Sequence, residues 1–146
     1  MEYRHTQLGG VIIVMVMIAF VLVLFPAWLS GTFHPVQLAV AGVLLVTLAL
    51  FHSLTVEVKD QNLMCSFGSG LIKKRIPLSD VEKVHIVRNP WYAGWGIRWM
   101  PGQYWLWNVS GFQAVELVYK NNTRFRIGTD EPESLVRAIQ ANKANT

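Results

Sequence analysis

Charged residues are almost absent from the first part of this 146-residue sequence. Residues 5–56 contain no Asp, Glu, Lys or Arg, whereas residues 57–146 carry 20 of the 22 charged side chains. Charged residues therefore make up 20 of the 90 residues in this second part, or 22%, which is close to their share in soluble domains. A charge-free run of this length excludes a soluble single-domain enzyme and a disordered chain, and the chain is too short for a multi-helix transporter.

Residues for metal or redox chemistry are also scarce. Cys65 is the only cysteine, which excludes an internal disulfide and suits a reducing compartment. Four histidines are scattered without metal-ligand spacing, at His5, His34, His52 and His85. No nucleophile–base pattern and no phosphate-binding loop occurs, so we expect no catalytic residue, no metal and no cofactor. The net charge of +4 comes without a nucleic-acid-binding signature, so we expect no nucleic-acid partner.

Two apolar segments fill the charge-free run. Of the 22 residues 8–29, 14 are Leu, Ile, Val or Phe, and a helix of that length is roughly 33 Å long, enough to cross a hydrocarbon core of about 30 Å. A weaker segment, 35–54, begins at Pro35 after a polar turn at 30–34. We therefore predict a transmembrane hairpin within residues 1–54, with helices at about 8–29 and 35–54.

Basic residues predict the orientation of this hairpin. The turn at 30–34 has no Lys or Arg, whereas Arg4 precedes the first helix and Lys59 and the 73–75 triplet follow the second. Positively charged flanks stay in the cytoplasm. We expect a multi-pass protein of the inner (plasma) membrane with both termini cytoplasmic. A cleaved signal peptide is the alternative for the first helix, but its apolar region would be only about 7–15 residues long.

The rest of the chain predicts a mainly-β domain. Between residues 55 and 128, short segments of alternating polarity separated by turn residues predict seven or eight strands. Asp130 and the acidic residues after it then begin an amphipathic helix at about 131–142. We therefore predict a cytoplasmic domain over residues 55–146.

Three segments of this domain carry a resemblance to a known family: Asn89-Pro90 with residues 94–98, residues 108–111, and residues 125–132. Together with the membrane hairpin, residues 55–140 resemble the pleckstrin-homology-like (PH-like) domains of small bacterial membrane proteins. The resemblance implies a PH-like β-barrel closed by a C-terminal α-helix. It implies no catalytic residue, because such barrels host many unrelated binding roles.

Tryptophan is concentrated in one short segment. Five of the six lie within residues 91–107: Trp91, Trp95, Trp99, Trp105 and Trp107. These rings, with Arg98 for a charged or cation–π contact, predict a surface that binds a partner or a lipid. The alternative is that they fill the core or rest at the membrane interface. Because five exceed the needs of a small core, we expect at least two to be exposed or at the membrane.

The loop around Pro101-Gly102 decides how these rings are arranged. A two-residue loop pairs Met100 with Gln103 and divides the tryptophans between two faces, whereas a three-residue loop pairs Met100 with Tyr104 and places those of 95–107 on one face. Pro-Gly favours a type II turn, which suits two-residue hairpins poorly. We therefore expect the longer loop.

A basic triplet, Lys73, Lys74 and Arg75, follows the membrane segment. It predicts a patch for anionic lipid headgroups, and the alternative is a topology signal on a solvated strand.

Together these features predict a membrane-tethered, non-catalytic binding or scaffold protein. Its partner would be another membrane protein or a second copy of the chain, in contact with membrane lipids. Alternatives are a lipid- or small-ligand-binding domain, or an accessory subunit of a membrane enzyme or transporter.

Overall fold

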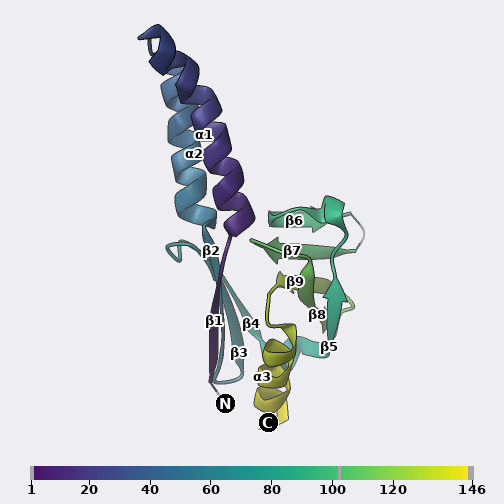
Figure 1. Ribbon diagram of the computed structural model, residues 1–146. Coiled ribbons are helices and arrows are strands. Elements are labelled where there is room, and N and C mark those ends of the chain that lie inside the picture. Colours follow the sequence, from purple (N-terminus) through teal and green to yellow (C-terminus); the bar gives the residue numbers. More distant parts are fainter. Residues whose placement is uncertain (1, 102, 145–146) are drawn as a thin grey trace.

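The computed structural model describes residues 2–101 and 103–144. Two helices, α1 (Gly10–Ser30) and α2 (Pro35–Phe51), run side by side away from a mainly-β body (Figure 1). At about 1.5 Å per residue, α1 is roughly 32 Å long and α2 roughly 26 Å. Among the described residues, α1 is the one helix that is long and apolar enough to cross a membrane, and only 11% of its most apolar stretch is buried.

The helices continue almost directly into the first sheet. Only Gly9 separates strand β1 (Tyr3–Leu8) from α1, and only His52 separates α2 from strand β2 (Ser53–Lys59). The two strands pair antiparallel, and Gly9 N–H donates to the His52 carbonyl at 2.7 Å between the helix bases. The sequence prediction was wrong here: residues 3–8 form a strand that was not predicted, the first helix begins at Gly10 rather than at 8, and the second helix ends at Phe51 rather than 54. A side chain on Gly9 would come within 2.9 Å of the Phe51 carbonyl oxygen, so the junction needs a glycine.

The first sheet is an antiparallel meander in the order β1-β2-β3-β4. Strands β3 (Asn62–Phe67) and β4 (Ile72–Pro77) complete it. The β2–β3 turn uses Asp60 and Gln61 at positive φ of 48° and 59°, which fits a two-residue hairpin loop. Lys59 pairs with Asn62 across this turn, which separates two of the predicted strands.

The second sheet has the order β5-β8-β9-β7-β6. Its strands are β5 (Val81–Arg88), β6 (Gly96–Met100), β7 (Tyr104–Asn108), β8 (Gln113–Tyr119) and β9 (Arg124–Gly128). All neighbours are antiparallel except β7 and β9. Short 3₁₀ turns, η1 (Leu78–Asp80) and η2 (Trp91–Ala93), flank β5.

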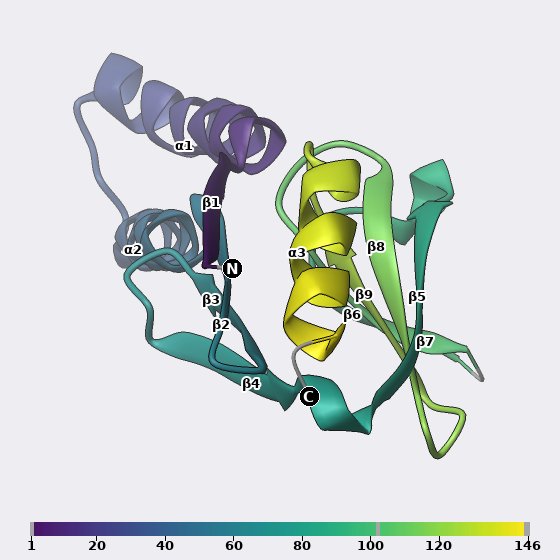
Figure 2. The same ribbon diagram turned by 90° about the horizontal axis from the view of Figure 1, so that it is seen from below.

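The two sheets face each other across one core, and helix α3 (Pro132–Ala144) lies between them (Figure 2). Phe67 of the first sheet and Phe125 of the second are buried in this core. Leu135, Ala138 and Ile139 of α3 join it, and α3 contacts strands of both sheets. The described residues form two separate sheets and no closed barrel, which corrects the expected barrel. The mainly-β class and the C-terminal helix are confirmed, with the helix at 132–144 rather than 131–142.

Candidate functional site

The loop between β6 and β7 has the longer of the two expected forms. Met100 pairs with Tyr104, and Trp99 lies opposite Trp105 with ring centroids 6.4 Å apart. The predicted three-residue loop is confirmed, while the turn type expected at Pro101-Gly102 lies outside the described residues. Trp107 follows on the same face of β7, where it contacts Phe67 and Phe125 in the core.

Trp95 does not share this face, which corrects the prediction that four tryptophans lie together. It stands just before β6, between Gly94 and Gly96, whose φ angles are +67° and +98°. These positive φ values interrupt the alternation of a strand, so the indole packs instead against Phe112, with centroids 6.2 Å apart.

Three of the five tryptophans within residues 91–107 are exposed, so the expectation of at least two is confirmed. Trp91 is 79% exposed, Trp99 54% and Trp105 47%, whereas Trp107 is buried. Exposed indoles are costly in water and are enriched where proteins meet partners or the membrane interface. The cluster therefore divides into a core residue, a Trp99–Trp105 pair, and a Trp91–Trp95 segment next to α1.

A groove of about 710 Å³ separates the Trp91–Trp95 segment from the base of α1. β6 is the edge strand of its sheet and lies near the level of the first turns of α1 (Figure 1). The groove is mostly apolar, and its walls come from Ile12, Met15, Val16, Trp91, Tyr92, Gly94, Trp95, Arg98 and Phe112. It joins the apolar surface of α1 to the aromatic segment of the domain.

Two donor groups at this groove lack an acceptor among the described residues. The buried Trp95 Nε1–H has no hydrogen-bond partner there. The exposed Arg98 guanidinium lies over Gly94, where an added Cβ would be 3.4 Å from Cζ, and it forms no ion pair within the described part of the chain. Arg98 is therefore available to an anionic or carbonyl-bearing occupant.

Side chains alternate between the two faces of β4, so the three residues of the basic triplet do not point the same way. Lys73 and Arg75 are exposed, and Arg75 Nε donates to Asn62 Oδ1 at 3.0 Å. Lys74 is half-buried and points toward the second sheet, with Nζ 4.5 Å from the centroid of the Phe125 ring. The structure therefore does not bring the three cations together into one patch.

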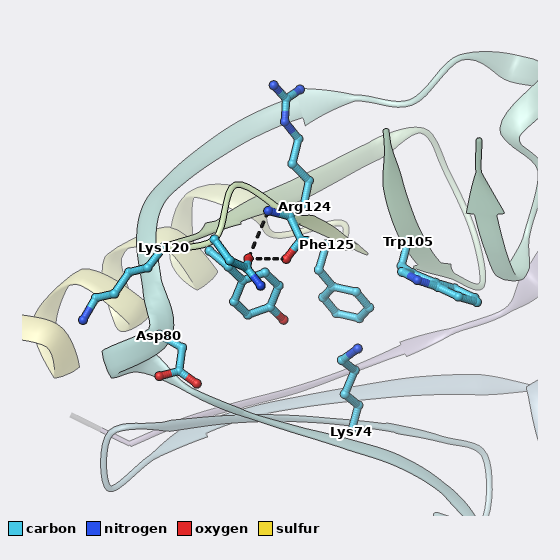
Figure 3. Close-up of a pocket in the computed structure, with 9 residues that line it drawn as sticks. Lys74, Asp80, Trp105, Lys120, Arg124 and Phe125 are labelled. Atoms are coloured by element: carbon cyan, nitrogen blue, oxygen red, sulfur yellow. Dashed lines mark hydrogen bonds between the residues drawn. The ribbon is translucent and has the colours of Figure 1, made fainter. Parts of the chain in front are cut away.

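Lys74 and Trp105, from two separate sequence motifs, meet in a second pocket between the sheets (Figure 3). Its volume is about 540 Å³. Lys74 points toward Phe125, whereas Lys120 and Arg124 point away from the pocket centre. The lining consists of Lys74, Asp80, Trp105, Tyr119, Lys120, Asn121, Thr123, Arg124 and Phe125.

Neither ionisable group in the core beside this pocket is activated. Burial raises the pKa of the Cys65 thiol to about 12, although nearby Lys74 opposes the shift. Burial also raises the pKa of the Tyr119 phenol to about 12, with smaller contributions from Cys65 and Asp80. Both groups stay protonated at neutral pH, so neither is a nucleophile or a general base.

Sequence reasoning missed the members of this pocket that come from the β8–β9 hairpin. Tyr119 and Phe125 were indistinguishable from core residues in the alternating pattern, and Arg124 was indistinguishable from a solvated cation.

No protein-family model matches the sequence, and a search of curated proteins finds no match.

Proposed function

We propose that this chain is a membrane-tethered, non-catalytic binding protein that holds a partner membrane protein. The α1–α2 hairpin would span the inner membrane, with the β body and both termini in the cytoplasm. The length and exposure of α1 support this arrangement, as do the basic residues that flank the hairpin and are missing from its tip. We also propose that the β body is related to PH-like domains. The two facing sheets and the terminal helix support this relation.

The observation that carries this proposal is the groove shared by α1 and the Trp91–Arg98 segment. Its α1 wall continues into an apolar helix surface, where Met15 and Ile18 are exposed. A partner's transmembrane helix that packs along α1 would place its cytoplasmic end in the groove. Trp91 and Trp95 would contact its apolar side chains, and Arg98 would meet its terminal carbonyl groups or an acidic side chain.

Affinity purification from native membranes tests this proposal. Trp91→Ala removes an exposed ring from the groove, and Trp99→Ala removes an equally large exposed ring outside it. We expect an integral membrane protein to co-purify with wild type and Trp99→Ala, and to be reduced roughly tenfold with Trp91→Ala. Equal recovery with both variants would exclude the groove as the contact. Differently tagged copies of the chain distinguish self-association from a different partner.

Lipid binding is a second candidate, favoured by the unpaired Arg98 guanidinium beside apolar walls. An anionic phospholipid would place its phosphate at Arg98 and an acyl chain along α1. Native mass spectrometry of the detergent-solubilised protein tests this. We expect Arg98→Gln to lose a bound anionic lipid and Arg137→Gln, at an exposed position of α3, to retain it.

A further inference from the structure

The pocket between the sheets has the dimensions of a small-molecule site. Its volume of about 540 Å³ is within the usual range of roughly 300–1,000 Å³ for ligand pockets. Three aromatic side chains contribute to its lining: Trp105, Tyr119 and Phe125. Trp105 keeps 47% of its surface exposed there, although it lies on the core-facing side of β7. Tyr119 is half-buried, whereas Phe125 is only 1% exposed and forms the floor of the pocket. The pocket therefore offers accessible ring surface on Trp105 and Tyr119.

Lys74 supplies the polar contact. Its half-buried ammonium group lies 4.5 Å from the Phe125 centroid, and no hydrogen bond or ion pair engages it among residues 2–101 and 103–144. A partly desolvated ammonium with only a ring beside it is more stable when an anion is bound.

The charge around the pocket also favours an anion. Lys120 and Arg124 belong to the lining with Lys74, against the single carboxylate of Asp80. Lys120 and Arg124 point outward, so they contribute a positive field at the rim rather than direct contacts (Figure 3).

We propose that this pocket binds a small anion with a flat apolar ring, of the class of aromatic carboxylates. The ring would lie against Trp105 and Tyr119, and the carboxylate would accept hydrogen bonds from Lys74 Nζ. The site contains no residue of the α1 groove, so this inference does not depend on the proposed partner binding.

Isothermal titration calorimetry of the full chain in nanodiscs, with 2-naphthoate as the probe and empty nanodiscs as the blank, tests the proposal. We expect saturable binding with Kd below about 1 mM. Lys74→Gln should weaken binding roughly tenfold, whereas Lys73→Gln makes the same charge change on the exposed face of β4 and should alter Kd by less than about twofold. Lys74→Arg, which keeps the charge, should retain most of the affinity and shows that the site still folds.

Two further comparisons separate this site from general affinity for aromatic surfaces. Neutral 2-naphthamide should bind wild type roughly tenfold more weakly than 2-naphthoate and should not distinguish Lys74→Gln from wild type. Trp105→Ala should weaken 2-naphthoate binding, and Trp91→Ala should not. The proposal is overturned by an absence of saturable binding, by equal losses in the Lys73 and Lys74 variants, or by equal losses in the two tryptophan variants.

Discussion

Arg126 and Glu116 lie directly opposite each other on β9 and β8, and Arg126 Nε donates to Glu116 Oε2 at 2.7 Å. Their side chains are only 14% and 8% exposed. The guanidinium also donates to Asn89 Oδ1 and lies 3.7 Å from the centroid of the Tyr104 ring. This network fixes the segment that leads into Trp91 to the sheet, and it connects the stability of the fold to the position of the groove.

Removing one partner of this pair is expected to destabilise the protein strongly. Glu116→Ala would leave a mostly buried guanidinium without its carboxylate, at a cost of about 3 kcal/mol in the free energy of unfolding. Thermal unfolding of the detergent-solubilised protein measures the change. Glu2→Ala is the control, because it breaks the exposed Lys59–Glu2 pair and should change the midpoint little. Similar midpoints for the two variants would contradict a structural role for the buried pair.

The β3–β4 turn is expected to depend on Gly68. Its φ is +46°, and an added Cβ would lie 2.5 Å from the Ala49 carbonyl oxygen at the end of α2. Gly111 also has positive φ, at +71°, but no atom lies within 4 Å of its Cβ position. Gly68→Ala should therefore cost about 2 kcal/mol more than Gly111→Ala in unfolding experiments. Equal losses would show that the turn does not pack against α2 this closely.

Alkaline pH is expected to destabilise the fold. Burial raises the pKa of the Tyr3 phenol to about 12, aided by Glu131 and Asp130, and Tyr119 and Cys65 are raised to about 12 as well. The folded state therefore holds these protons more tightly than the unfolded state. Their stabilisation is complete below about pH 9 and is lost as the pH rises toward about 12.

Unfolding measured between about pH 8 and pH 11 checks this dependence, with Tyr3→Phe as the comparison. The Phe variant lacks one of the three groups, so its stability should fall less steeply with pH. Parallel curves for wild type and Tyr3→Phe would refute the contribution of Tyr3.

Membrane topology is open to a labelling test because the native cysteine is shielded. Cys65 is fully buried and protonated at neutral pH, so we expect no reaction with maleimides. In intact cells, an impermeant maleimide should label Thr32→Cys, at the tip between the helices. Asn121→Cys, in the β8–β9 turn, should react only after permeabilisation. Labelling of Asn121→Cys in intact cells would reverse the proposed orientation.

The secondary structure of the body followed from local patterns. Alternating polarity between turn residues was enough to predict the strands of residues 55–128. The unsuitability of Pro-Gly for a two-residue loop was enough to predict the pairing of Met100 with Tyr104. Strand β1 was missed because Tyr3–Leu8 is short, has few apolar residues, and acquires a partner only when the α1–α2 hairpin brings it beside β2.

The candidate sites required contacts between distant segments. The parallel pairing of β7 with β9 has no local signal, yet it places Trp105 beside Phe125. The orientation of Lys74 could have been inferred from alternation with buried Ile76, but its position opposite Phe125 depends on how two sheets pack. The departure of Trp95 from the shared face depends on the positive φ of Gly94 and Gly96, which the sequence permits but does not require.

Site-specific photo-crosslinking from α1 tests the central claim most directly. Met15 and Met17 are 58% and 50% exposed on the same helix, but only Met15 lines the groove. With a photoreactive amino acid at position 15, we predict a crosslink to an integral membrane protein in native membranes, and its loss when Trp91→Ala is added. Position 17, about 200° away around the helix, should give no such product. Crosslinks of equal yield from both positions, or a crosslink from position 15 that persists with Trp91→Ala, would contradict the account.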